Sequence, residues 1–196
     1  EIGRSWLITV GLGAIVTVLS VVVRSFGGVF AAGVLSVAAL WPLAEQGHAA
    51  GTANHEAAVS ASYAHSVFAA MWIGGLAVMA IIAWSEKPST SSLTTMLQRY
   101  STIALVSFIV VAVSGLTNAW LRVGTLADLT SGYGALVIAK TLSLVILGVM
   151  GALYRGRLIS SLGQGKRKNS AVVSRMIAAE LTVMGVASGL ASALAR

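Results

Sequence analysis

Cysteine is absent from the sequence, and charged residues make up only 10% of its 196 residues. Without cysteine the chain has no disulfide, no thiolate metal site and no thiol redox chemistry, so a soft metal ion depends on histidine or methionine for its ligands. A soluble domain carries about 25% charged residues, whereas 57% of this chain is hydrophobic. The composition therefore predicts that most of the chain lies in a membrane.

The sequence also lacks the patterns that mark an enzyme or a nucleic-acid-binding protein. It contains no nucleophile–base arrangement, no phosphate-binding loop and no pair of close carboxylates. The net charge is +7, but the basic residues stand in short loops between apolar runs, whereas a nucleic-acid-binding protein spreads them over a folded face. We therefore expect neither an enzyme nor the binding of nucleic acid.

Six apolar runs are each long enough for a helix that crosses a membrane, for which about 20 residues are needed. The chain begins with Glu1 rather than methionine, and its first run is too long for the core of a signal peptide. We therefore interpret it as a segment of a longer polypeptide or a processed product. The predicted fold is an all-α, polytopic transmembrane helix bundle in one domain, residues 1–196, with about six spanning helices over residues 5–23, 26–43, 57–84, 99–123, 133–158 and 175–195.

The distribution of Lys and Arg predicts the orientation of the bundle, because short loops rich in these residues stay in the cytoplasm. If the loop over residues 159–174 is cytoplasmic, nine basic residues fall on the inner side and three on the outer side. The loop over residues 45–56 and both chain ends then face outward, and we expect the basic loop to lie against anionic lipid headgroups. The nine inner residues are Arg24, Lys87, Arg99, Arg155, Arg157, Lys166, Arg167, Lys168 and Arg175, and the three outer ones are Arg4, Arg122 and Arg196.

Ionisable and amide side chains within the predicted spans are candidate functional residues, because such groups are costly in hydrocarbon. His65, Asn118 and Lys140 stand on three different helices at a similar depth beneath the outer surface, about 10 Å for His65. If their faces converge, they form an outward-facing polar site. Glu180 lies nearer the inner side, where an arginine is its expected partner and a proton or ion relay is the alternative.

Each residue of this polar layer also has a purely structural interpretation. His65 is also explained by a hydrogen bond to a backbone carbonyl or to Asn118, and Asn118 by a bond that holds helices together. Lys140 is also explained by a side chain that extends to the interface. A protonated Lys140 repels a cation such as Cu⁺, so a cation site requires it to be deprotonated or pointed away.

Further candidate metal ligands stand on either side of His65. His48 and His55 lie in the predicted outer loop, where neutral imidazoles can bind copper or zinc. Met71 and Met79 follow in the same predicted helix, and Met79 shares the stripe of His65 but lies about 20 Å away along the axis. The two therefore cannot share one metal ion, although they can mark a path across the membrane. The expected helix-packing residues on this helix are Trp72, Gly74 and Gly75.

Several short motifs, read in order, resemble the copper resistance protein D (CopD) family, and the resemblance covers residues 45–196. The family carries a "GHA" before one helix, an "H…W-hydrophobic-GGL" pattern within it, an "SGL-x-N…LR" exit from the next, a "YG…LLLK" segment, an arginine after that helix and an "R…E" pattern in the last helix. The matching residues are Gly47-His48-Ala49, His65 with Trp72-Ile73-Gly74-Gly75-Leu76, Ser114-Gly115-Leu116-Thr117-Asn118 with Leu121-Arg122, Tyr133-Gly134 with Lys140, Arg155, and Arg175 with Glu180.

This resemblance implies an inner-membrane protein that handles copper. Members of the family are associated with moving copper inward across the cytoplasmic membrane, often with a periplasmic copper-binding partner of the CopC type. In some actinobacterial proteins a similar segment is fused to a domain that resembles the assembly factor CtaG, and excision from such a fusion suits a chain that begins at Glu1. The resemblance makes copper ions the cargo, with His65, His48 and His55 as the candidate outward-facing ligands.

Two alternatives stay open at the level of the sequence. A redox module would hold haem b between His48 and His65, with Lys140 paired to a propionate. A membrane scaffold subunit would use the same polar residues, together with its many glycines, only to pack helices or to bind a partner.

Overall fold

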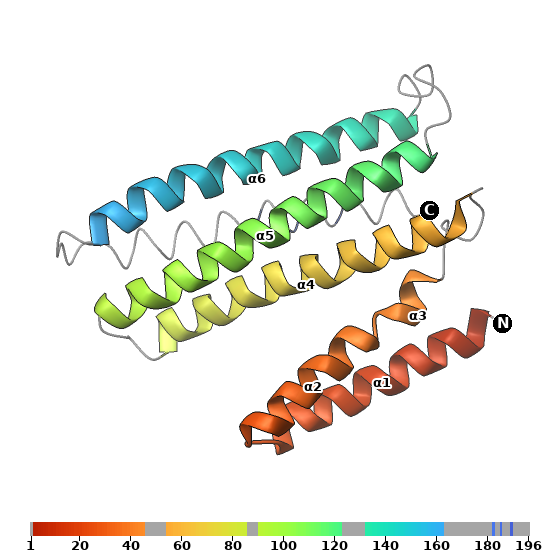
Figure 1. The fold of residues 1–196 in the computed structure, drawn as a ribbon, viewed down its shortest axis with the longest axis horizontal. Helices are drawn as coiled ribbons and strands as arrows, with labels where there is room; N and C mark the ends of the chain where they lie inside the picture. Colours follow the sequence, from red (N-terminus) through yellow and green to blue (C-terminus); the bar gives the residue numbers. More distant parts are fainter. Residues whose placement is uncertain are drawn as a thin grey trace. The chain divides into compact units, whose positions relative to one another are not determined.

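The computed structural model describes residues 2–45, 54–85, 90–122 and 132–162, together with three single positions further on. Every element in this part of the chain is a helix, so the predicted all-α fold is confirmed (Figure 1). The helices are α1 (Ile2–Val22), α2 (Phe26–Ala38), α3 (Trp41–Ala44), α4 (His55–Ser85), α5 (Thr90–Arg122) and α6 (Gly132–Leu162).

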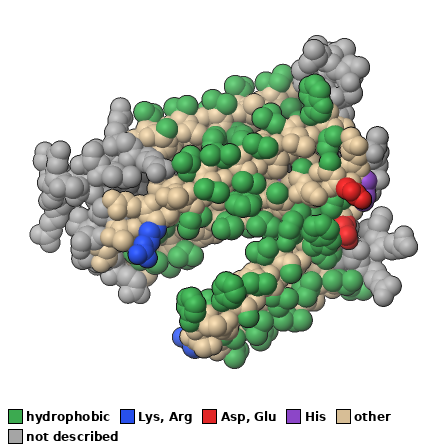
Figure 2. Space-filling view, in the orientation of Figure 1, with side chains coloured by type: hydrophobic (Ala, Val, Ile, Leu, Met, Phe, Trp, Pro, Cys, Tyr) green, Lys and Arg blue, Asp and Glu red, His purple; other side chains and the backbone are tan. Residues whose placement is uncertain are grey.

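Three segments of the described chain are long and apolar enough to cross a membrane, namely Phe26–Ala44, His55–Ile82 and Thr95–Leu121. Shorter apolar stretches, Leu7–Val22 and Val137–Leu153, lie in α1 and α6. Many large apolar side chains on these helices are exposed, and they cover much of the helix surface in Figure 2. Apolar surface of this extent is stable in lipid but not in water, so the chain is a multi-pass membrane protein.

The helices extend beyond the apolar runs that predict them. α5 begins at Thr90 instead of residue 99, and α6 continues to Leu162 instead of ending at residue 158. The 33 residues of α5 make a helix about 50 Å long, whereas the hydrocarbon layer is about 30 Å thick. An apolar run therefore marks the part of a helix that is suited to hydrocarbon, and polar residues such as Thr90, Ser91 and Ser92 continue the helix beyond it.

Two predicted loops and the predicted last helix are described only in part. His55 and Glu56, which the sequence analysis places in the outer loop, form the first turn of α4. Residues 159–162, predicted to begin the basic loop, belong to α6. The predicted helix over residues 175–195 lies outside the described residues except for Thr182, Gly185 and Gly189, each of which is helical.

The second predicted span, residues 26–43, is not one continuous helix. α2 ends at Ala38, and α3 is a separate helix of four residues that contains Pro42. Proline has no backbone N–H, so the carbonyl of Ala38, four residues earlier, has no helical donor. Pro42 therefore accounts for the interruption of this span near its end.

The chain divides into two compact units, and the division falls within α4 and α5. The first unit contains residues 1–67 and 114–122, so it includes α1, α2, α3, the first part of α4 and the last part of α5. The second unit contains residues 68–113 and 123–196, which include α6.

In the first unit, α1 packs against α2 and α3. Ser25 begins α2, since its hydroxyl accepts a hydrogen bond from the backbone N–H of Gly28 at 3.3 Å, as expected of a helix N-cap. The end of the broken span packs against the start of α4, where Ala44 lies in one buried cluster with Ala58 and Val59. These small side chains bring the broken span and α4 close together.

The core of the second unit is a contact among α4, α5 and α6 around Trp72. The indole is only 5% exposed, and it packs edge-on against Phe108 with ring centroids 5.7 Å apart. Two glycines admit these aromatic rings, because a Cβ on Gly75 would stand 2.6 Å from Tyr100 and one on Gly148 would stand 2.7 Å from Phe108. The Tyr100 hydroxyl donates to the Trp72 carbonyl at 2.8 Å. This bond fixes the position of the Tyr100 ring against Gly75.

We expect Gly75→Ala to destabilise the protein by about 1–3 kcal/mol, the usual cost of overpacking, because the added methyl group meets the fixed ring of Tyr100. Gly74→Ala is the matched control, since a Cβ on Gly74 has nothing within 4 Å and alanine favours a helix over glycine by about 1 kcal/mol. Thermal unfolding in detergent measures both variants. Equal melting temperatures would contradict this packing.

Candidate functional site

Two side-chain hydrogen bonds join α4 to α5 in the first unit. His65 Nδ1 lies 3.1 Å from the hydroxyl oxygen of Ser114, and the Ser62 hydroxyl donates to Asn118 Oδ1 at 3.4 Å. Ser62 and His65 are three residues apart, and Ser114 and Asn118 are four apart, so each pair shares one face of its helix. Ser62, the earlier residue on α4, contacts Asn118, the later residue on α5, as expected of antiparallel helices. A polar seam of imidazole, hydroxyl and amide groups therefore joins these two spans.

The seam holds the imidazole of His65 in a defined orientation. Ser114 is buried at 6% exposure, and the ring lies against the backbone at Gly115, where a Cβ would stand 3.5 Å from His65 Cε1. In the tautomer in which Nδ1 carries the proton and donates to the Ser114 oxygen, Nε2 is the basic nitrogen of the ring. Metal-bound histidines use the same arrangement, with one ring nitrogen on the metal and the other held by a neighbouring group.

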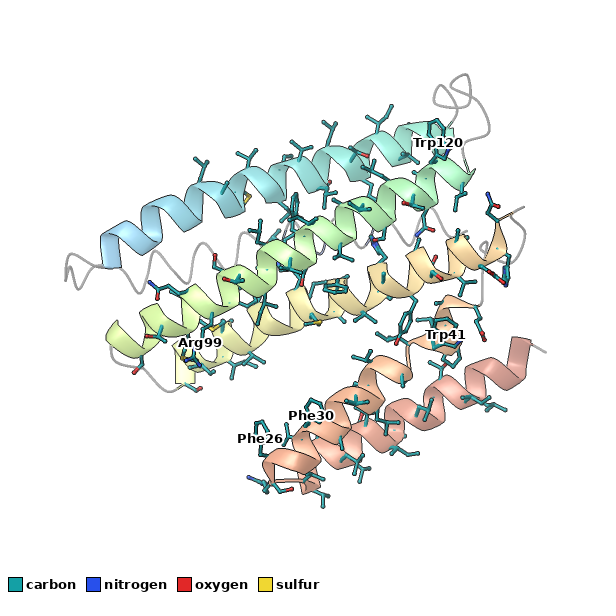
Figure 3. The ribbon with its side chains drawn as sticks, viewed as in Figure 1. Phe26, Phe30, Trp41, Arg99 and Trp120 are labelled. Carbon is teal, nitrogen blue, oxygen red and sulfur yellow. The ribbon has the colours of Figure 1, made fainter. Side chains whose placement is uncertain are left out.

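Tyr63, two residues before His65 on α4, contacts both α2 and α3. Its hydroxyl donates to the carbonyl of Val37 at 3.0 Å, and its ring packs edge-on against Trp41 with centroids 5.0 Å apart. The indole N–H of Trp41 in turn donates to the Glu45 carboxylate at 2.8 Å, and Figure 3 shows Trp41 at the end of the broken span. Tyr63 therefore links the end of α2 and the start of α3 to the helix that carries His65.

The remaining predicted ligands are only partly placed. His55 is exposed at the first residue of α4, ten residues before His65 and therefore about 15 Å from it along the helix. His48 lies outside the described residues, as does Glu180. Lys140 is partly buried on α6 and belongs to the second unit, so its convergence with the polar seam stays a prediction.

The two predicted methionine ligands lie on α4 within the second unit. Met79 is buried at 5% exposure, whereas Met71 is 44% exposed. No methionine occurs in residues 1–67 or 114–122, so the donors of the first unit are nitrogen and oxygen atoms. Among the residues that the structure describes, no three His, Cys, Asp or Glu side chains come close enough together to hold a metal ion. The seam therefore offers one imidazole with hydroxyl and amide oxygens beside it.

Sequence reasoning did not identify Ser62, Ser114 or Tyr63 as functional candidates. Ser114 stands in the "SGL" motif four residues before Asn118, so a search for polar residues on the face of Asn118 would have found it. Ser62 precedes His65 by three residues, so a search for polar residues on the face of His65 would have found it. Tyr63 has no such signal, because its partner is the backbone carbonyl of Val37, which no residue pattern marks in the sequence.

We expect Ser114→Ala to lower the free energy of unfolding by about 1 kcal/mol, a usual value for one hydrogen bond between membrane helices. The variant also removes the hydroxyl beside His65 Nδ1, so the ¹⁵N shifts of this imidazole should change. Ser66→Ala is the control, since the Ser66 hydroxyl donates to a carbonyl of its own helix at 2.9 Å. Imidazole shifts that are unaffected by Ser114→Ala would contradict the assigned contact.

Comparison with known families supplies the context for this seam. The family model described as copper resistance protein D (CopD) matches residues 94–194, which is more than half of the chain. The match includes Ser114 and Asn118 and begins after His65, so the predicted extension of the family region to residue 45 stays a prediction. No curated protein and no solved structure matches the chain. With its helical membrane fold and this match, the chain belongs to the copper resistance protein D family.

Proposed function

We propose that this protein binds copper at an outward-facing site around His65 and moves or delivers it across the cytoplasmic membrane. The observation that carries the proposal is the contact between His65 Nδ1 and Ser114 at 3.1 Å, in a chain whose family is named for copper resistance. An imidazole on a spanning helix is costly in hydrocarbon unless it has a use or a partner. Here its partner leaves the ring oriented as a metal-bound histidine requires.

The first steps of copper capture are assigned to the histidines before and at the start of α4. His48 and the exposed His55 would take copper from the outer solution, and His65 would receive it about 15 Å further along the helix from His55. Asn118 and the hydroxyl groups of the seam would supply oxygen atoms beside the imidazole. Imidazole nitrogen is a suitable ligand for copper in either oxidation state.

Methionines would continue the path through the second unit. Met79 follows His65 by fourteen residues on α4 and is buried, so its thioether would act as a separate soft ligand for Cu⁺ rather than as part of the same site. Met71 lies between them in sequence but is largely exposed. Lys140 and Glu180 are proposed as polar groups that adjust the charge along this path.

The proposed orientation places the loop between α3 and α4 outside and the basic residues after α6 in the cytoplasm. In this orientation Arg24, which precedes α2, lies on the cytoplasmic side, as expected of a basic residue. The basic loop would also bind anionic lipids, at about 1 kcal/mol per basic residue. The proposed partner on the outer side is a copper-binding protein of the CopC type or a CtaG-like assembly domain.

Copper bound by the purified protein tests the site. We expect His65→Asn to abolish the bound copper and the copper-dependent growth phenotype, because asparagine can still bond to Ser114 but has no ring nitrogen for the metal. Ser114→Ala should lower copper affinity about 10–100-fold, the usual effect of losing the group that orients a ligand. Ser66→Ala should bind copper as the wild type does, since its hydroxyl bond is internal to α4.

Unchanged copper stoichiometry and growth in His65→Asn would refute this site. The polar seam would then serve only to pack helices, which is the scaffold interpretation. An absorption spectrum of the same purified protein tests the haem alternative, which requires a Soret band that His65→Asn removes.

The absence of cysteine makes the proposed orientation directly measurable. We expect an impermeant maleimide to label Thr52→Cys in intact cells, because residue 52 lies in the outer loop of the proposed topology. Ser170→Cys should be labelled only after the cells are opened, because it lies in the basic loop. Labelling of Ser170→Cys in intact cells would reverse the orientation and place His65 near the cytoplasmic side.

A further inference from the structure

Two buried polar atoms of the second unit have no hydrogen-bond partner among the protein groups that the structure describes. They are the indole Nε1 of Trp72 and the hydroxyl oxygen of Ser107. Trp72 is 5% exposed and Ser107 is 0% exposed. An unpaired polar group in such surroundings is strongly destabilising, and no hydrocarbon chain relieves it. Two such atoms within one helix contact therefore require a ligand or a rearrangement.

The hydroxyl of Ser107 differs from those of three serines on the described helices that bond within their own helix. Ser36, Ser66 and Ser143 each donate to the backbone carbonyl four residues earlier, at 2.7–2.9 Å. This bond is the usual way in which a serine satisfies itself inside a helix. Ser107 has the carbonyl of Ile103 at the same position and does not bond to it. Its hydroxyl is therefore directed elsewhere.

Ser107 and Trp72 lie at the same level of the contact between α4 and α5. Phe108, the residue after Ser107, packs edge-on against the Trp72 ring. Ala104, one turn before Ser107 and on the same face of α5, packs against the buried cluster that contains Trp72 and Leu76. Ser107 thus stands between two residues that both contact the Trp72 cluster.

The surroundings restrict the chemistry of a ligand at this level. The described hydrophobic cluster around Trp72 includes Leu76, Leu144 and Phe108, and an ion is costly beside such side chains. The indole N–H only donates, so the ligand must accept a hydrogen bond, whereas the Ser107 hydroxyl both donates and accepts. A small neutral molecule with both capacities satisfies both atoms, and water is such a molecule.

We propose that Trp72 Nε1 and the Ser107 hydroxyl bind one internal water molecule between α4 and α5. Buried waters usually bond to two or more polar groups that the protein leaves unsatisfied, and this pair supplies two. The water joins the helices in the second unit, as direct side-chain bonds such as that of Ser62 to Asn118 join them in the first. This site does not depend on copper.

Magnetic resonance of the protein in lipid nanodiscs, with ¹⁵N-labelled tryptophan, tests the proposal. The indole signal that disappears in Trp72→Phe belongs to Trp72, and we expect it to show a cross-peak to a bound water. Should that variant fail to fold, replacing the other four of the five tryptophans assigns the signal by elimination. Ser107→Ala should weaken the cross-peak and lower the melting temperature by roughly 2–4 °C.

Ser143→Ala is the matched control, since Ser143 is a partly buried serine of α6 that already bonds to its own helix. It should leave both the cross-peak and the Trp72 signal unchanged. A Trp72 signal without a water cross-peak overturns the proposal. So does a Ser107→Ala variant whose melting temperature is unchanged or higher, because the hydroxyl then either bonds to its own helix or stands unpaired.

Discussion

Polar groups within hydrocarbon must form hydrogen bonds inside the protein, and this requirement governs how α4 packs against α5. In the first unit the imidazole of His65 meets the hydroxyl of Ser114. In the second unit the hydroxyl of Tyr100 reaches the carbonyl of Trp72 across Gly75. A shift of one residue between the helices would break these bonds at a cost that lipid cannot offset. The contacts that join the helices are therefore also the contacts that orient the proposed copper ligand.

The sequence predicts the helical membrane fold well, because the length of an apolar run follows from the thickness of the bilayer. Helix ends are less predictable, since nothing stops a helix at the membrane surface. The extension of α5 back to Thr90 shows this, as polar Ser and Thr residues continue the helix into water. The break at Pro42 has a visible cause in the sequence, but proline near the end of a span also marks an ordinary exit.

The sequence identifies only two of the four residues that form the polar contacts between α4 and α5. His65 and Asn118 are conspicuous because an imidazole or an amide in a span is rare and costly. Ser114 and Ser62 are not, because most helical serines satisfy themselves, as Ser66 does. Which serine instead bonds across to another helix depends on the facing of α4 and α5, which one sequence without a structure does not specify. The family match covers the α5 side of the seam, and the structure brings His65 to it.

The central claim is that copper binds first at His65, whose imidazole Ser114 orients, and that the methionines further along α4 are not the primary site. X-ray absorption at the copper edge of the purified, copper-loaded protein tests it most directly, because imidazole nitrogen and thioether sulfur scatter differently. The account predicts imidazole scattering in the wild type that is lost in His65→Asn. A spectrum with sulfur neighbours alone, unchanged in His65→Asn, would contradict it and would place the copper at Met71 or Met79.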